Sequence, residues 1–169
     1  TMGGEVTGTI DESIRHAVTK FAHIHFPASN DAANRLLKLG ERKKDIYLVG
    51  CPRIDLVAEI LKNNEQIDMS YLEDVVGNKI NIDNPFILIS QHPVTTEYGE
   101  GESQIQATLE SVKETGFPAI VLWPNPDAGS DDISRGIRKF REANSDNKFH
   151  YYKNLPINTY VHLMNRTLC

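Results

Sequence analysis

Five short apolar runs alternate along the chain with segments whose apolar residues recur at helical spacing. The runs are residues 23–29, 45–50, 85–90, 119–125 and 149–154, such as PFILIS and AIVLWPN. Short continuous apolar runs bounded by Gly, Pro or Asn fit strands that are buried on both faces of a parallel sheet. The pattern therefore predicts a strand in each run.

The segments between these runs predict helices. Each has an apolar stripe with a period close to 3.6; the stripes fall at residues 10–21, 32–37, 54–61, 105–112, 133–140 and 160–164. Alternating strands and helices indicate an α/β fold with right-handed crossovers between parallel strands. The polar, turn-rich residues 77–84 have no apolar period, so they predict a domain boundary.

Composition narrows the class of protein. The 169 residues, 40% hydrophobic and 24% charged, suit one ordinary domain or two small pieces of a globular protein. A net charge of -5 provides no general basic field, which argues against nucleic acid or an anionic membrane as partner. Cys51 and Cys169, the only cysteines, suggest neither a disulfide framework nor a zinc site and fit a reducing cytoplasm. No apolar run approaches the roughly 18 residues of a membrane span.

The stretch GTIDESIRH, residues 8–16, places two carboxylates, Asp11 and Glu12, ahead of Arg15. Thr9 and Glu12 have the spacing of a capping box, which is a purely structural interpretation. Asp11 and Arg15 face each other at i,i+4 and could form a surface ion pair or part of an active site. The preceding glycines could hold an anion at the start of the helix.

Two polar loops directly follow predicted strands. QHPVTTE, residues 91–97, contains His92, and WPNPDAGSDD, residues 123–132, contains Asn125 before a helix capped by Ser130 or Asp131. Side chains at the carboxyl ends of parallel strands face the ligand crevice of an open α/β sheet. The alternatives are a turn histidine bonded to backbone and an ordinary strand-to-helix loop. The spacing of His, Cys, Asp and Glu predicts no metal site.

The chain resembles the hydrolysing UDP-N-acetylglucosamine 2-epimerases, and most closely the branch of bacterial sialic acid and polysialic acid biosynthesis. The resemblance rests on GGEVTGTIDESIRHAVTKFAH, LVGCPRIDLV, QHPVTTE and LWPNPDAGS, which occur in the family's order. Related hydrolases that act on diacetamido UDP-sugars share much of this pattern.

The resemblance implies two Rossmann-like parallel-sheet halves, as in the glycosyltransferase-B architecture, with the active site between them. The family is about twice as long as this chain. Residues 1–80 would then be the latter part of the first domain and residues 84–169 the opening of the second. We accordingly expect the 169-residue chain alone to be inactive.

The implied reaction converts UDP-N-acetylglucosamine to N-acetylmannosamine and UDP by elimination and hydration, in the cytoplasm and without a cofactor or a metal. Asp11 and Arg15 match catalytic positions of the family, and Glu12 accompanies them. His92, Asn125 and the backbone near Leu155 match substrate-binding positions. Many relatives carry an acid where this chain has Met2, so the second acid/base group is left open.

The resemblance also implies a homo-oligomer of the full-length protein, with a UDP-sugar as substrate. Two other functions are open on the same architecture. One is a glycosyltransferase, which would need an acceptor site, and the other is a UDP-sugar binding module without turnover.

Overall fold

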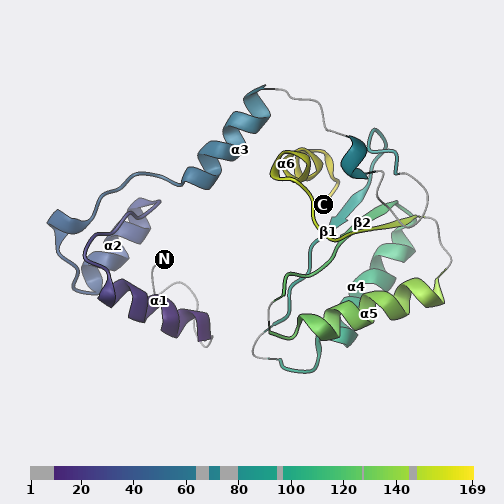
Figure 1. Cartoon of the computed structure of the whole chain (residues 1–169), viewed down its shortest axis with the longest axis horizontal. Helices are drawn as coiled ribbons and strands as arrows, with labels where there is room; N and C mark the ends of the chain where they lie inside the picture. Colours follow the sequence, from purple (N-terminus) through teal and green to yellow (C-terminus); the bar gives the residue numbers. More distant parts are fainter. Residues whose placement is uncertain (1–9, 64–68, 73–79, 95–96, 127, 145–147) are drawn as a thin grey trace. The chain divides into compact units, whose positions relative to one another are not determined.

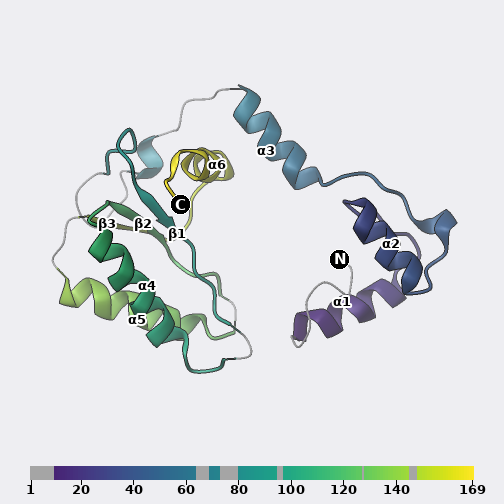
Figure 2. The same ribbon diagram turned by 180° about the vertical axis from the view of Figure 1, so that it is seen from behind.

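The computed structural model describes residues 10–63, 69–72, 80–94, 97–126, 128–144 and 148–169. The chain divides into two compact units, Thr1–Glu59 and Ile60–Cys169, whose α-helices and strands are labelled in Figures 1 and 2. Residues 80–82 of the predicted boundary belong to the second unit, because Ile80 and Ile82 are buried in its core. The assignment of the two halves to domains of a longer enzyme stays a prediction.

The second unit is built on a parallel sheet in the order β1-β2-β3. Its strands are β1 (Ile87–Ile89), β2 (Ala119–Leu122) and β3 (Phe149–Tyr152). Ala119 pairs with Ile87 on one side and with Phe149 on the other, so the three strands start in register. The three later apolar runs therefore form strands as predicted, and the α/β fold class with a parallel sheet is confirmed.

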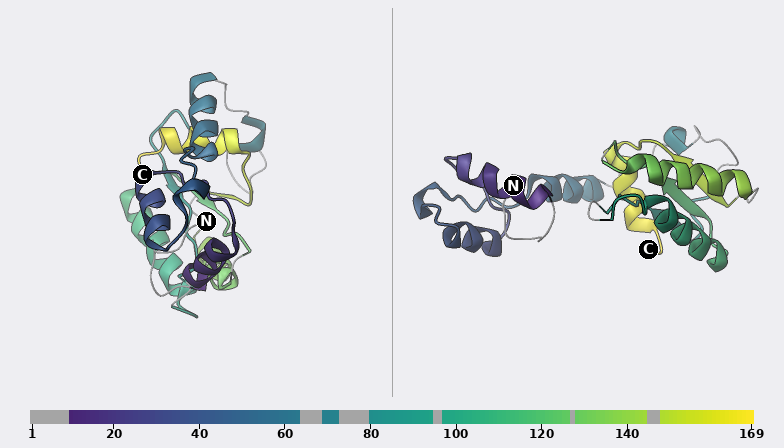
Figure 3. Two further views of the ribbon diagram at one scale, coloured as in Figure 1. Left: turned by 90° about the vertical axis from the view of Figure 1, so that its left-hand side faces the viewer. Right: turned by 90° about the horizontal axis from the view of Figure 1, so that it is seen from below.

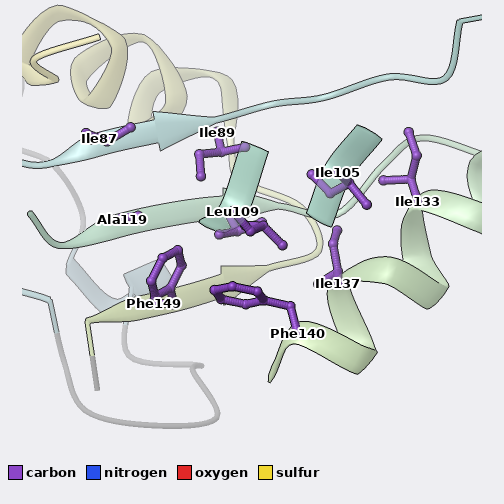
Figure 4. Close-up of a cluster of buried hydrophobic side chains, with 10 residues drawn as sticks. Ile87, Ile89, Ile105, Leu109, Ala119, Ile133, Ile137, Phe140 and Phe149 are labelled. Carbon is purple, nitrogen blue, oxygen red and sulfur yellow. The ribbon is translucent and has the colours of Figure 1, made fainter. Parts of the chain in front are cut away.

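Helices cover both faces of this sheet. The helices α4 (Gly101–Thr115) and α5 (Ser130–Ala143) lie on one face, and α6 (Ile157–Arg166) lies on the other together with the short 3-10 helix η2 (Met69–Leu72) (Figures 1 and 2). Alternate strand residues enter two separate clusters: Ala119 packs with Leu109 of α4 and Ile137 of α5 (Figure 4), whereas Ile120 lies in the cluster that contains Leu163 of α6.

The helices α4 and α5 run side by side (Figure 3) and contact each other tightly at Gly136. A Cβ atom at this position would lie 2.4 Å from Cγ2 of Ile105 and 3.0 Å from the backbone oxygen of Glu102. Glu102 also lies 3.5 Å from Arg135 and forms an ion pair with Lys139. The ammonium group of Lys139, followed by Arg135, holds the pKa of the Glu102 carboxyl below its usual range.

The first unit contains the predicted helices but not the predicted strands. Its elements are α1 (Ile10–Phe21), α2 (Asn30–Lys38), the 3-10 helix η1 (Lys43–Asp45) and the opening of α3 (Pro52–Asn63). The apolar runs 23–29 and 45–50, predicted as strands, form a single parallel bridge between His25 and Ile46.

The prediction failed there because the described part of this unit offers these runs no sheet to enter. Half or more of the surface of Phe26 and Val49 is exposed, and an isolated pair of strands is at best marginally stable. The apolar stripe of α1 is exposed too, and Phe21 keeps 82% of its surface.

Charged side chains connect the carboxyl end of α1 to the residues that follow α2. The Lys20 ammonium donates to Glu41 Oε1 at 2.7 Å and also to the carbonyl of Leu39. His25 Nε2 lies 3.2 Å from the other oxygen of Glu41. These two neighbours, Lys20 before His25, hold the pKa of Glu41 below its usual range despite the opposing effect of burial.

Candidate functional site

A hollow of about 260 Å³ opens in the second unit, at the carboxyl ends of the three parallel strands. Its lining comes from the residues that follow each strand, from the last residue of β2 and from α6: Ser90, His92, Leu122, Trp123, Asn125, Lys153, Asn154, Leu155 and Tyr160. Ligands of open α/β sheets bind at this edge. The hollow is therefore the candidate functional site.

The loop after β1 carries His92. Pro93 follows it directly and biases its backbone away from helix, and residues 90–94 after β1 are neither helix nor strand. The preceding residue, Gln91, accepts a hydrogen bond of 2.7 Å at its side-chain oxygen from the hydroxyl of Thr108 on α4. The loop is thus tied to a helix of the core on one side of His92.

Gly129 brings the loop after β2 close to the loop after β1. It caps α5 with a left-handed φ of 88°, and a Cβ atom there would lie 3.2 Å from Cβ of Pro93. A larger residue would be strained and would push the two loops apart. The predicted cap at Ser130 or Asp131 is wrong, because Gly129 is the N-cap residue and α5 begins at Ser130.

Trp123 and Asn125 enter the hollow from the loop after β2. Trp123 is half-buried, and the guanidinium carbon of Arg138 on α5 lies 5.6 Å from the centroid of its ring. A cation over an indole ring at this distance restrains the ring. Asn125 is exposed, so its amide is open to a ligand.

The third side of the hollow is the short link between β3 and α6. Lys153 and Asn154 are exposed, whereas Leu155 is half-buried. The helix begins directly after Pro156, whose carbonyl accepts a hydrogen bond of 2.9 Å from the backbone N–H of Tyr160. The first turn of α6 thereby places Tyr160 at the hollow.

The chemistry of the lining favours an anionic ligand that contains a ring. Lys153 is a cation, His92 can become one, and Asn125 and Ser90 supply hydrogen-bond donors. Trp123 and Tyr160 supply aromatic surface. None of the described residues that line the hollow is acidic, so none of these residues would repel a phosphate.

The three predicted binding residues, His92, Asn125 and Leu155, all line this hollow. Sequence reasoning did not single out Trp123, Lys153 or Tyr160. Trp123 and Lys153 directly follow β2 and β3, so applying the strand-end rule to every strand would have found them. No comparable signal marks Tyr160.

The predicted catalytic residues belong to the first unit, at the start of α1. Asp11 is exposed, Arg15 is half-buried, and Glu12 is buried with Oε1 3.1 Å from Nε2 of His16. Two acids in the first turn also suit the positive end of the helix dipole. Thr9 and the glycines before it lie outside the described residues, so the capping box and the anion-binding loop remain predictions.

The described residues offer neither a metal cluster nor a membrane-spanning helix. They contain no group of three or more His, Cys, Asp or Glu side chains placed to hold a metal ion. No helix in the same part of the chain is both long enough and apolar enough to cross a membrane.

Comparison with known proteins gives one consistent family. Residues 1–169 match the family model described as UDP-N-acetylglucosamine 2-epimerase. A curated UDP-N-acetylglucosamine 2-epimerase of Neisseria meningitidis serogroup B is 32% identical over 140 residues, which are 82% of this chain and 35% of that protein. A Campylobacter jejuni GDP/UDP-N,N'-diacetylbacillosamine 2-epimerase (hydrolyzing) is 30% identical over 164 residues, covering 96% and 41% of the two chains.

Among solved structures, Methanocaldococcus jannaschii UDP-GlcNAc 2-epimerase, in complex with UDP-GlcNAc and UDP, superposes with a TM-score of 0.66. The identity is 16%, and the match covers 92% of this chain and 41% of that one, so it shows a shared fold. The chain spans 35% and 41% of the lengths of the two curated relatives.

Proposed function

Because the chain belongs to the UDP-N-acetylglucosamine 2-epimerase family, we propose that the full-length protein hydrolyses UDP-N-acetylglucosamine to N-acetylmannosamine and UDP. The observation that carries the proposal is the hollow at the carboxyl ends of β1, β2 and β3, which gathers His92, Asn125 and Leu155. The word "hydrolyzing" in the name of the Campylobacter jejuni relative supports the hydrolytic form.

In the proposed reaction a base removes the proton at C2 of the sugar while the C1–O bond to UDP breaks. The electron pair of the C2–H bond becomes the C1–C2 double bond, and UDP departs with the electrons of the C1–O bond. Water then adds across the double bond: its oxygen bonds to C1 and a proton returns to C2 on the opposite face. Atoms balance with no oxidant, reductant or cofactor.

We assign nucleotide binding to the second unit. His92 donates a hydrogen bond to the diphosphate, more strongly when it is protonated. Asn125 and the backbone near Leu155 bind the uridine side. In these roles the hydrogen-bond donors and ring surfaces that line the hollow bind the nucleotide and take no part in proton transfer.

We assign proton transfer to Asp11, because a carboxylate can accept a proton and the one on Asp11 is exposed. Arg15 supplies a positive charge that the departing diphosphate requires. Glu12 is a weaker candidate, since its carboxyl is buried beside His16. The protein acts as a homo-oligomer in this proposal.

The first test is turnover by the full-length protein. UDP-N-acetylglucosamine should yield N-acetylmannosamine and UDP in equal amounts, which a transferase or a binding module would not produce. The corresponding diacetamido UDP-sugar should be tested in parallel, because the Campylobacter jejuni relative is named for such a compound. Release of UDP only with an added acceptor would refute the proposal in favour of a glycosyltransferase.

Asp11→Asn should lower turnover about 10²- to 10⁴-fold, since an amide cannot take up the proton. Asp31→Asn is the matched control, because Asp31 is an exposed acid in the first turn of α2, as Asp11 is in α1. Both should leave the circular dichroism spectrum unchanged. Wild-type turnover by Asp11→Asn would assign this carboxylate a purely structural role.

His92→Ala should weaken the binding of UDP alone, in the absence of any sugar. Calorimetric titration of UDP measures the affinity, and His23→Ala, which removes an exposed histidine of the first unit, is the control. Unchanged UDP affinity with lost turnover would instead make His92 a proton carrier and would overturn this division of roles.

A further inference from the structure

A second hollow, of about 550 Å³, lies around the carboxyl half of β3. Its walls are Ser70 and Tyr71 of η2, Arg141 of α5, and residues 151–154. It adjoins the candidate site, because Lys153 and Asn154 line both hollows. Its other wall residues have no part in the proposed reaction.

The hollow lies along the edge of the sheet that β3 forms. Tyr151 and Tyr152 are neighbours in β3, and their side chains point to opposite faces: Tyr151 packs on the cluster beneath α4 and α5, and Tyr152 on the cluster beneath α6. Both nevertheless line this hollow. Among the described strands β3 pairs only with β2, and no described strand pairs with its other edge.

A buried hydrogen bond fixes one wall. The hydroxyl of Tyr152 donates to the carbonyl of Leu72 at 3.2 Å, and both residues are buried. This bond ties the end of η2 to the sheet. Tyr71, next to Leu72, is therefore held in place although about half of its surface is exposed. The position of this wall is thus set by contacts within the unit.

The two charged side chains among the described residues of this hollow are both basic. Arg141 and Lys153 are exposed, and neither forms an ion pair with another described residue. No acidic side chain occurs among the described residues of the lining. A guanidinium group offers a planar pair of donors that matches phosphate oxygens, and the ammonium of Lys153 adds a second charge.

We propose that this hollow is a second binding site, for a phosphorylated ring compound of the nucleotide or sugar-phosphate class. Arg141 and Lys153 hold the phosphate, and the ring lies against Tyr71 and Tyr151. The volume of about 550 Å³ falls within the range of about 300–1,000 Å³ usual for sites of small organic ligands. The inference concerns binding alone and does not rest on the proposed reaction.

A simpler role for the same cations has to be separated from this one. Charged side chains beside an open strand discourage pairing with a second chain. In that case, removing a charge would promote self-association and leave small ligands unaffected. The experiment therefore measures ligand affinity and oligomeric state on the same samples.

The probes are uridine monophosphate, glucose 6-phosphate and inorganic phosphate, titrated by calorimetry into the full-length protein and into Arg141→Met. Arg53→Met is the matched control, because Arg53 is an exposed arginine of the first unit and its loss changes the charge equally. A His92→Ala background weakens binding at the candidate site. Hydrogen–deuterium exchange then locates the probe, with residues 69–72 reporting on the second hollow.

We expect uridine monophosphate or glucose 6-phosphate to protect residues 69–72. Arg141→Met should weaken that binding tenfold or more, the effect of losing a charge-assisted hydrogen bond, whereas Arg53→Met should not. Equal affinities in the two variants would overturn the proposal, as would equal binding of inorganic phosphate and the ring compounds. If Arg141→Met self-associates while its affinity for the probes is unchanged, the proposal is wrong, and the cations instead prevent β3 from pairing with a second chain.

Loss of UDP binding in His92→Ala tests the candidate site alone, so failure of the proposed function and failure of this inference give different results.

Discussion

Replacement of Gly136 by alanine tests whether the close contact of α4 with α5 limits the stability of the second unit. Intrinsic helix propensity alone predicts a gain, because alanine is favoured over glycine by about 1 kcal/mol inside a helix. The packing predicts a loss. The sign of the change therefore decides which effect dominates.

The magnitude follows from the contacts at this position. The new Cβ would lie 2.4 Å from Cγ2 of Ile105, more than 1 Å inside the roughly 3.5–4.0 Å at which two carbon atoms attract. It would also lie 3.0 Å from the backbone oxygen of Glu102, which cannot rotate away. Ile105 is only 1% exposed, so its side chain has no room to retreat.

Overpacking of a core costs about 1–3 kcal/mol, and these contacts call for the upper end of that range. Subtracting the helix-propensity gain of about 1 kcal/mol leaves Gly136→Ala less stable by about 2 kcal/mol. For a unit of this size the midpoint of thermal unfolding should fall by about 8 °C.

The assay is thermal unfolding, with hydrogen exchange of the β1–β3 amides to assign the change to the second unit. Ala107→Gly, at an exposed position of α4, calibrates helix propensity in the same pair of helices. In a double-mutant cycle Ile105→Ala removes the clashing methyl group, so the double variant should be more stable than the sum of the single changes predicts. Ile105→Val retains the γ-methyl group at Cγ2 and should give no such relief.

A Gly136→Ala protein that is as stable as wild type, or more stable, would refute the reasoning. Additive effects in the cycle with Ile105→Ala would refute it as well, because they would show that the two side chains do not compete for the same space.

Two further predictions concern titratable groups. Burial raises the pKa of the Tyr152 hydroxyl to about 12. The stability contributed by the buried neutral hydroxyl is therefore fully present below about pH 10 and is lost as pH rises toward 12. Tyr152→Phe should lower stability by about 1–3 kcal/mol at neutral pH, because the Leu72 carbonyl loses its donor, and it should lack this alkaline step, measured by thermal unfolding against pH. The pKa of the Glu41 carboxyl is lowered, first by Lys20. Its contribution to stability is therefore present above about pH 4.3 and is lost as pH falls through the lowered pKa. Glu41→Gln should reduce this loss of stability of the first unit in acid, whereas the control Glu59→Gln should leave it unchanged.

The apolar runs of the two units look alike in sequence, yet only those of the second unit become strands. Residues such as Ile120 and Val121 succeed because both faces of their strand are covered, one by α6 and the other by α4 and α5. The run around Phe26 is also short and partly apolar but lacks a covering layer in the described residues. A local pattern predicts the tendency to form a strand, whereas the layers that bury it come from distant parts of the chain.

In the candidate site, too, some residues could be predicted from the local sequence and others depend on distant parts of the chain. His92 and Asn125 could be predicted because each comes just after a strand, and the order of parallel strands brings such residues to one edge. Tyr160 could not, because its place depends on how α6 starts after Pro156. The capping of α5 by Gly129 was missed since polar residues usually lead at that position.

Trp123 gives the candidate hollow an optical reporter of its own. It is the only tryptophan of the 169 residues, so all indole emission from this chain arises beside the hollow. The guanidinium of Arg138 already lies over its ring. A ligand that enters the hollow would displace water from the indole, so the intensity and wavelength of its fluorescence would change with occupancy. Ligand entry to this site can thus be followed in real time without a label.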